Sequence, residues 1–143
     1  MANDSQQSAR LLAGVIGRYL AQLRVSAGDV QLLFDDGTCV RLAGTTRFDD
    51  EPEIEEPQSL AGLALLLPLL NETVVSAGVD ESGTLAVAFD AGVLRCQPDE
   101  TYEAWEFTTE AGAMVVCMGG GALVIWSDQQ DAQTRQRRWG RTS

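Results

Sequence analysis

The sequence predicts an α+β fold built mainly from antiparallel β-hairpins, and three observations carry this prediction. Large apolar residues recur at every second position in several short segments, which is the period of a strand with one buried face. One apolar segment, residues 60–67, has the length and composition of a helix. Glycines recur in pairs at one spacing, and the pairs are Gly28 and Gly37, Gly83 and Gly92, and Gly112 and Gly121.

The alternation is clearest between the paired glycines. The apolar positions there are Val30, Leu32 and Phe34, then Leu85, Val87 and Phe89, then Met114, Val116 and Met118. With the flanking segments, we expect strands over residues 15–25, 30–34, 38–42, 73–79, 85–89, 93–97, 102–108, 114–118 and 122–126. Short strands joined by tight turns indicate an antiparallel meander rather than a parallel sheet with crossover helices. Residues 1–9 are expected to be a disordered or helical lead-in.

The turn sequences indicate how the hairpins close. Asp35-Asp36-Gly37 and Asp90-Ala91-Gly92 each suit a three-residue loop, in which a type I turn is followed by a left-handed glycine. We therefore expect Gly37 and Gly92 to be left-handed. The run Gly119-Gly120-Gly121 leads into a strand, and the sequence contains no Lys, so it predicts a hairpin turn rather than a phosphate-binding loop.

The helix is predicted near residues 59–68. Ser59 is suited to cap its first turn, and Pro68 is expected to end or kink it. Because the helix is apolar all round, we expect it to be largely buried against the sheet. The sheet itself is expected to be rolled, or to form a partly open barrel whose open end the helix plugs.

The composition excludes several classes of function. The formal net charge is −11, and the ten basic residues are all Arg. This charge argues against nucleic-acid binding through phosphate neutralisation. The absence of His removes the commonest general base and metal ligand, and with it Ser-His-Asp and Cys-His catalysis within the chain. We expect no cofactor, no metal site and no enzymatic activity.

Cysteine usage and hydropathy bear on the compartment. The sequence has an odd number of cysteines, Cys39, Cys96 and Cys117, and no two of them form a CxxC motif. We therefore expect buried free thiols in a reducing compartment. The polar N-terminal segment shows no signal peptide, and the apolar run 60–70 is too short to span a bilayer. These features predict a cytoplasmic protein without membrane contact.

Two charged segments are the first candidates for partner binding. Residues 49–56, an acidic loop by composition, supply the candidates Asp49, Asp50, Glu51, Glu53, Glu55 and Glu56. The last twelve residues contain four Arg and no Asp or Glu, and supply the candidates Arg135, Arg137, Arg138 and Trp139. We therefore divide the chain into one α+β domain, residues 1–131, and an Arg-rich flexible tail, residues 132–143. The tail is expected either to fold back onto the acidic loop or to be solvated.

The aromatic residues supply two further candidates. Tyr102-Glu103-Ala104-Trp105 is the most distinctive string, and Trp126 ends the last expected strand. Aromatic side chains in strands usually belong to the core, which is where we expect Trp105 and Trp126. An exposed Trp would instead indicate a binding hot spot.

The order of three motifs resembles a small, uncharacterised bacterial family of β-rich proteins, a domain of unknown function. The motifs are Phe-x-x-Gly, Tyr-Glu-Ala-Trp and, at residues 120–126, Gly-Gly-x-Leu-x-x-Trp. The resemblance covers residues 11–126 and leaves out the Arg-rich tail. This chain has Met118-Gly119 where the family pattern has Pro-Gly, so that turn is expected to differ. The resemblance implies the fold and no catalytic residue.

These observations favour a non-catalytic, acidic protein-interaction module. Its most concrete form is an immunity-type protein that neutralises a basic toxin, because acidic clusters steer a basic partner and speed encounter. The first alternative is a self-assembling structural or accessory component that uses exposed edge strands or Trp residues. The second is a small domain that binds an apolar ligand between helix and sheet.

Overall fold

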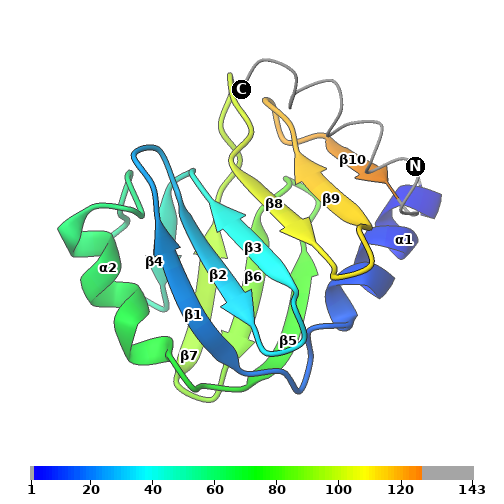
Figure 1. Ribbon diagram of the computed structural model, residues 1–143. Helices are drawn as coiled ribbons and strands as arrows, with labels where there is room; N and C mark the ends of the chain where they lie inside the picture. Colours follow the sequence, from blue (N-terminus) through cyan, green and yellow to red (C-terminus); the bar gives the residue numbers. More distant parts are fainter. Residues whose placement is uncertain (1, 127–143) are drawn as a thin grey trace.

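The computed structural model describes residues 2–126 and shows two antiparallel sheets with two helices (Figure 1). The helices are α1 (Ala2–Ala13) and α2 (Leu60–Leu66), followed by the 3-10 turn η1 (Leu67–Leu69). The strands are β1 (Leu20–Val25), β2 (Val30–Phe34), β3 (Cys39–Leu42), β4 (Thr46–Phe48), β5 (Val74–Val79), β6 (Leu85–Phe89), β7 (Gly92–Cys96), β8 (Trp105–Thr108), β9 (Met114–Cys117) and β10 (Leu123–Trp126). The predicted β-rich α+β fold is confirmed, and the described residues form no closed barrel.

The strand order departs from a simple meander at two points, where β3 pairs with β8 and where β4 pairs with β7. One sheet runs β1-β2-β3-β8-β9-β10 and the other β4-β7-β6-β5, with every pair antiparallel. The chain leaves the first sheet after β3, builds the whole second sheet, and returns as β8 beside β3. In Figure 1 the first sheet lies in front of the second. Strand β4, at the edge of the second sheet, was not predicted from the sequence.

The two sheets are joined where β3 passes into β4. The carbonyl of Ala104 accepts hydrogen bonds from the amides of Ala43 (2.8 Å) and Gly44 (2.9 Å), and the carbonyl of Thr45 accepts one from Gln97 (2.9 Å). A Cβ at Gly44 would lie 2.7 Å from both the Ala104 Cβ and the Gln97 carbonyl oxygen. A glycine is therefore needed for the chain to cross from one sheet to the other.

The hydrophobic core fills the space between the sheets. Period-two alternation places Leu32, Val40, Val87 and Phe107 in it, each almost wholly buried. Trp105 is also fully buried, as predicted, and its indole Nε1 donates a hydrogen bond to the Gly83 carbonyl at 2.8 Å. This bond ties the first sheet to the turn between β5 and β6.

The helices differ most from the sequence-based expectation. Helix α1 extends through Ala13, and the strand expected over residues 15–25 begins only at Leu20. Leu12 is wholly buried, and α1 lies against β5, β9 and β10, where it closes one open side of the two sheets (Figure 1).

Helix α2 begins and ends as predicted but is not largely buried. The Ser59 hydroxyl accepts a hydrogen bond from the Gly62 amide at 3.2 Å, and Pro68 lies in η1. Among its residues, Gly62 and Leu66 are buried, while Leu60 remains 87% exposed. The predicted burial was wrong because α2 lies beside the sheets and turns one face to the core and the other to solvent (Figure 1).

The glycines of the predicted turns have positive φ, as expected, but one loop differs in length. Gly37 is left-handed, with φ 90°, and Gly120 and Gly121 have φ 90° and 94° in the turn that joins β9 and β10. Gly92 has φ 154°, and its pairing with Phe89 leaves a two-residue loop. The positive φ predicted for Gly92 is confirmed, whereas the predicted three-residue loop is wrong there. Gly92 lies against Asp49 and Phe48, and a Cβ would stand 2.7 Å from the Phe48 ring.

The reassignment of the two helices leads to a paired prediction. Leu12→Ala should lower the free energy of unfolding by about 2–5 kcal/mol, because it leaves a cavity in the core. Leu60→Ala, the same change on α2, should alter it by less than about 0.5 kcal/mol, because Leu60 is exposed. Urea denaturation of both variants measures the difference, and equal losses would contradict these helix positions.

Candidate functional site: the Arg41 pocket

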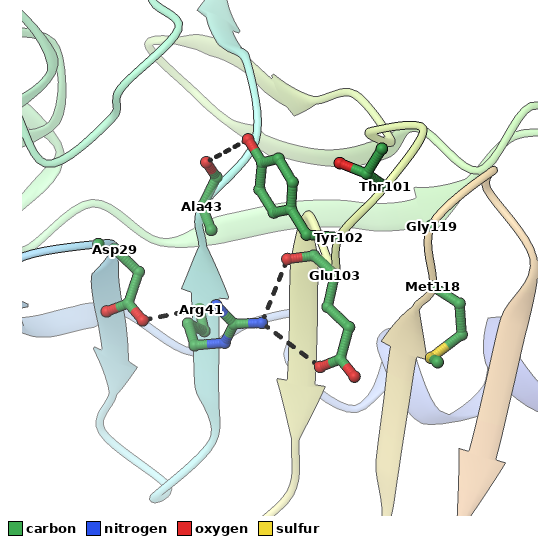
Figure 2. Close-up of a pocket in the computed structure, with 9 residues that line it drawn as sticks. Asp29, Arg41, Ala43, Thr101, Tyr102, Glu103, Met118 and Gly119 are labelled. Carbon is green, nitrogen blue, oxygen red and sulfur yellow. Dashed lines mark hydrogen bonds and ion pairs between the residues drawn. The ribbon is translucent and has the colours of Figure 1, made fainter.

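An open pocket of about 650 Å³ lies at one end of the first sheet (Figure 2). Because neighbouring strands are antiparallel, the start of β2, the end of β3, the start of β8 and the end of β9 meet at this end. We call it the Arg41 pocket. Its lining residues are Gly28, Asp29, Arg41, Ala43, Thr101, Tyr102, Glu103, Met118 and Gly119.

Strand alternation places the charged side chains of this region on the outer face of the sheet. Val40 and Leu42 are buried in the core, so Arg41 between them faces outward. Trp105 and Phe107 are buried in the same way on β8, so Glu106 between them also faces outward. The register of the two strands pairs Glu106 with Arg41.

Three carboxylates surround the half-buried guanidinium of Arg41. Its Nη1 lies 3.4 Å from Asp29 Oδ2, its Nη2 lies 3.8 Å from Glu103 Oε1, and its Nε lies 4.0 Å from Glu106 Oε2. Nη2 also donates to the Glu103 carbonyl at 3.4 Å, and Figure 2 shows the Asp29 and Glu103 contacts. Within residues 2–126, the guanidinium of Arg41 is therefore shared among three carboxylates at distances of 3.4–4.0 Å.

Asp29 adds an acceptor to the pocket, and Tyr102 adds a hydroxyl that already donates a hydrogen bond. The buried Oδ1 of Asp29 has no hydrogen-bond partner within residues 2–126. The Tyr102 hydroxyl donates to the Ala43 carbonyl at 3.4 Å. Burial and the nearby carboxylates raise the pKa of Tyr102, so its hydroxyl stays protonated at neutral pH. Glu55 and Glu56, at the end of the acidic loop, are among those carboxylates.

Asp99 shapes the loop that carries Tyr102 and Glu103. Its Oδ2 accepts hydrogen bonds from the Thr101 amide and hydroxyl, both at 2.9 Å, and from the Tyr102 amide at 3.3 Å. These bonds, led by that of the Thr101 amide, hold the pKa of Asp99 below its usual value. A carboxylate that folds the chain back in this way is typical of an Asx turn.

The acidic loop is exposed, as its composition predicted. All six candidates, Asp49, Asp50, Glu51, Glu53, Glu55 and Glu56, lie on the surface. Asp49 has an additional structural role, since its Oδ1 accepts a hydrogen bond from the Val93 amide at 2.8 Å and fastens the loop to β7. Glu53 accepts a bond from the side chain of Gln97. The other four remain candidates for contact with a partner.

The remaining candidates fall into two groups. Trp105 lies in the core and presents no surface to a partner, while Trp126 is half-buried against Met114 and Val116. The predicted tail, with Arg135, Arg137, Arg138 and Trp139, lies outside the described residues.

Sequence reasoning missed Arg41 and the carboxylates around it as a site. The available signal was a charged residue between two large apolar residues of a strand, as in Val40-Arg41-Leu42 and Trp105-Glu106-Phe107. That signal assigns each side chain to the outer face. It does not show that strands more than 60 residues apart in the sequence are neighbours.

The three cysteines are free thiols, as predicted. Cys96 and Cys117 are buried, and burial raises the pKa of each to about 11. Cys39 is half-buried, and burial followed by the charge of Glu106 raises its pKa as well. Within residues 2–126, no group of three or more Asp, Glu or Cys side chains is arranged to hold a metal ion. No helix in that range is long and apolar enough to cross a membrane.

The fold and the site define a two-sheet α+β domain with an acidic pocket on one sheet. Residues 13–127 match the model of a family described as "Family of unknown function (DUF6188)", and the chain belongs to this family. The predicted resemblance to an uncharacterised family is thereby confirmed. No match was found among curated proteins or among solved structures.

The ion pairs of Arg41 lead to a prediction about stability. Arg41→Gln should lower the free energy of unfolding by about 2 kcal/mol, between the values for exposed and buried ion pairs, because three carboxylates lose their shared counter-charge. Arg24→Gln is the matched control, since Arg24 is exposed on the same face, and should cost less than about 0.5 kcal/mol. Similar losses in urea denaturation would show that the cluster does not stabilise the fold.

The raised thiol pKa values lead to a second prediction. At pH 8 a disulfide reagent such as DTNB should modify Cys39 first, and Cys96 and Cys117 only after denaturant is added. The free energy of unfolding should fall as pH rises from about 9 to about 11, because unfolded thiols ionise there while the buried ones stay protonated. The variant Cys39→Ser should be almost unreactive when folded, and rapid modification of its two thiols would contradict their burial.

Proposed function

We propose that this protein is a non-catalytic, acidic interaction module that binds a basic protein partner. Its particular form is an immunity-type protein that neutralises a basic toxin, acting in the cytoplasm. The observation that carries the proposal is the Arg41 pocket, which the carboxylates of Asp29 and Glu103 line and whose guanidinium is also shared with Glu106.

The pocket offers what an arginine or lysine side chain of a partner needs. The Asp29 and Glu103 carboxylates and the Ala43 carbonyl are acceptors on its walls, and the Tyr102 ring is part of the same wall. A cation over a tyrosine face gains further attraction. The exposed carboxylates of residues 50–56 would steer a basic partner towards the pocket and speed encounter.

The chemistry of the pocket supports binding rather than catalysis. Its charged groups contact one another, and the pKa of its tyrosine is raised. The pocket lining contains no Cys, Ser or Lys, and its hydroxyls belong to Thr101 and Tyr102. The Thr101 hydroxyl donates to Asp99, whose lowered pKa makes it a weak general base.

Self-assembly is the second candidate, and the exposed face of α2 favours it. Leu60 on α2, Leu67 in η1 and Leu70 directly after η1 are all exposed. A surface of this kind is typical of contacts between proteins. A stable oligomer of the purified chain in light scattering, with no foreign protein present, would favour this candidate over the first.

The proposed partner binding is tested in two stages. The tagged chain should co-purify with a basic protein from its native host, and the complex should weaken steeply as salt rises. Glu103→Gln and Asp29→Asn should each weaken binding about two- to fivefold, as expected for a partly screened ion pair. Glu110→Gln, which removes the same charge in the turn between β8 and β9, should leave binding unchanged.

Two outcomes would refute this function. One is a purified chain that is monomeric and captures no basic protein. The other is a complex whose affinity responds to Glu110→Gln as strongly as to Glu103→Gln, because binding would then follow net charge rather than the pocket. If the partner is a toxin, its activity should be abolished at one equivalent of this protein.

A further inference from the structure

Two arginine side chains stand opposite each other on the outer face of the second sheet. The register pairs Arg47 of β4 with Arg95 of β7. Leu94 and Cys96 are buried in the core, so Arg95 between them faces outward, and Arg47 opposite it points the same way. Like charges directly opposite each other in a sheet are destabilising. The pair is therefore unfavourable for the fold unless a negative charge lies beside it.

The described residues do not supply that charge by direct contact. Within residues 2–126, neither Arg47 nor Arg95 has a carboxylate oxygen within 4.0 Å, and the buried Nε of Arg47 has no hydrogen-bond partner. The bridge between Thr46 and Ile54 places Glu53 next to Arg47 along the chain, but the Glu53 carboxylate accepts a hydrogen bond from Gln97 instead. A guanidinium N–H is a strong donor, and burying it without an acceptor costs free energy.

A pocket of about 480 Å³ adjoins the two arginines, and we call it the Arg47–Arg95 pocket. Ser82 and Thr84 bring hydroxyl groups to its wall. The Ser82 hydroxyl donates to Asp80 Oδ1 at 2.6 Å, and its oxygen lies 3.0 Å from Thr84 Oγ1. The Thr84 hydroxyl is thus the one that can donate to a ligand, beside the two guanidinium groups.

Asp80 is the one carboxylate in the lining of this pocket, and the turn between β5 and β6 occupies it. Besides the Ser82 hydroxyl, its Oδ1 accepts hydrogen bonds from the amides of Ser82 at 2.9 Å and Thr84 at 3.0 Å. These bonds, led by that of the Ser82 hydroxyl, lower the pKa of Asp80, so it carries a negative charge at neutral pH. Two arginines and one aspartate leave the lining with one excess positive charge, in a chain whose net charge is −11.

We propose that the Arg47–Arg95 pocket binds the phosphate group of a small molecule. Guanidinium groups match phosphate oxygens in geometry and charge, and the three terminal oxygens of a phosphate suffice for both arginines and the Thr84 hydroxyl. The volume lies within the range of small-molecule sites. The net charge of the chain repels a long polyanion, which favours a small ligand over a nucleic acid. The site is on the other sheet from the Arg41 pocket and is independent of the basic partner proposed above.

Phosphate titration of the full-length chain, followed by NMR, tests this site. At constant ionic strength, the Nε–Hε signal of Arg47 should shift and saturate as inorganic phosphate is added, because its unpartnered Nε gains an acceptor. Acetate at the same concentration should cause little shift, since one carboxylate cannot serve both arginines. Glycerol 3-phosphate is the second probe. Tighter binding than inorganic phosphate would identify an organic phosphate as the ligand, and equal binding would identify free phosphate.

Substitutions of single arginines supply the matched comparison. Arg47→Gln and Arg95→Gln should each weaken phosphate binding about tenfold, the loss expected for one hydrogen bond to a charged group, with the Thr84 amide signal as readout. Arg95 is exposed, so its variant keeps the fold. Arg24→Gln removes the same charge from an exposed position on β1 of the first sheet and should leave phosphate binding unchanged.

Three results would overturn the proposal. The first is an Arg47 signal that does not saturate with phosphate, or that responds to acetate as strongly. The second is a loss of affinity in Arg24→Gln equal to that in Arg47→Gln, because binding would then follow net charge. The third is an Arg47 signal that shifts in Glu53→Gln but not with phosphate, which would make Glu53 the counter-charge of the pair.

Discussion

The structure depends on the pairing of β3 with β8. This ladder joins Cys39–Leu42 to Trp105–Thr108, although all strands of the second sheet lie between these segments in the sequence. It therefore brings the two halves of the chain into one sheet. Its inward side chains, among them Val40, Trp105 and Phe107, form the centre of the core. Its outward side chains, Arg41 and Glu106, form the charged cluster. One register therefore sets both the packing and the site, and a shift by one residue would exchange the two faces.

The carboxylates of this acidic protein have two different roles in the structure. Several carboxylates shape the chain: Asp49 holds the acidic loop to β7, and Asp80 and Asp99 close turns through hydrogen bonds to nearby amides. Those bonds keep the pKa of Asp80 and of Asp99 low, so these two groups stay ionised near neutral pH. Asp29, Glu103 and Glu106 instead converge on a single arginine. Partner binding is proposed there because carboxylate and carbonyl acceptors meet at one open pocket.

Sequence patterns predicted the local structure better than the contacts between elements. Alternation identified the β2, β6 and β9 strands, and the Ser59 and Pro68 signals bounded α2. The same reasoning predicted that α2 is largely buried because it is apolar, and it did not predict the burial of Leu12 on α1. Composition describes what a helix could bury, whereas its place at the edge of two sheets decides how much it does bury. The Arg41 pocket was missed for a related reason, since strand pairing is invisible to a period-two pattern.

The sequence by itself determined the class of fold, the buried face of most strands, the exposure of the acidic loop and the absence of histidine chemistry, because these follow from composition and periodicity. Tertiary structure alone decided that β8 returns to β3, that Leu12 of α1 is wholly buried while Leu60 of α2 is exposed, and that Arg41 meets three carboxylates. The physical reason is that side-chain period fixes the direction in which a residue points. The partner that it meets there is fixed by the long-range pairing of backbones.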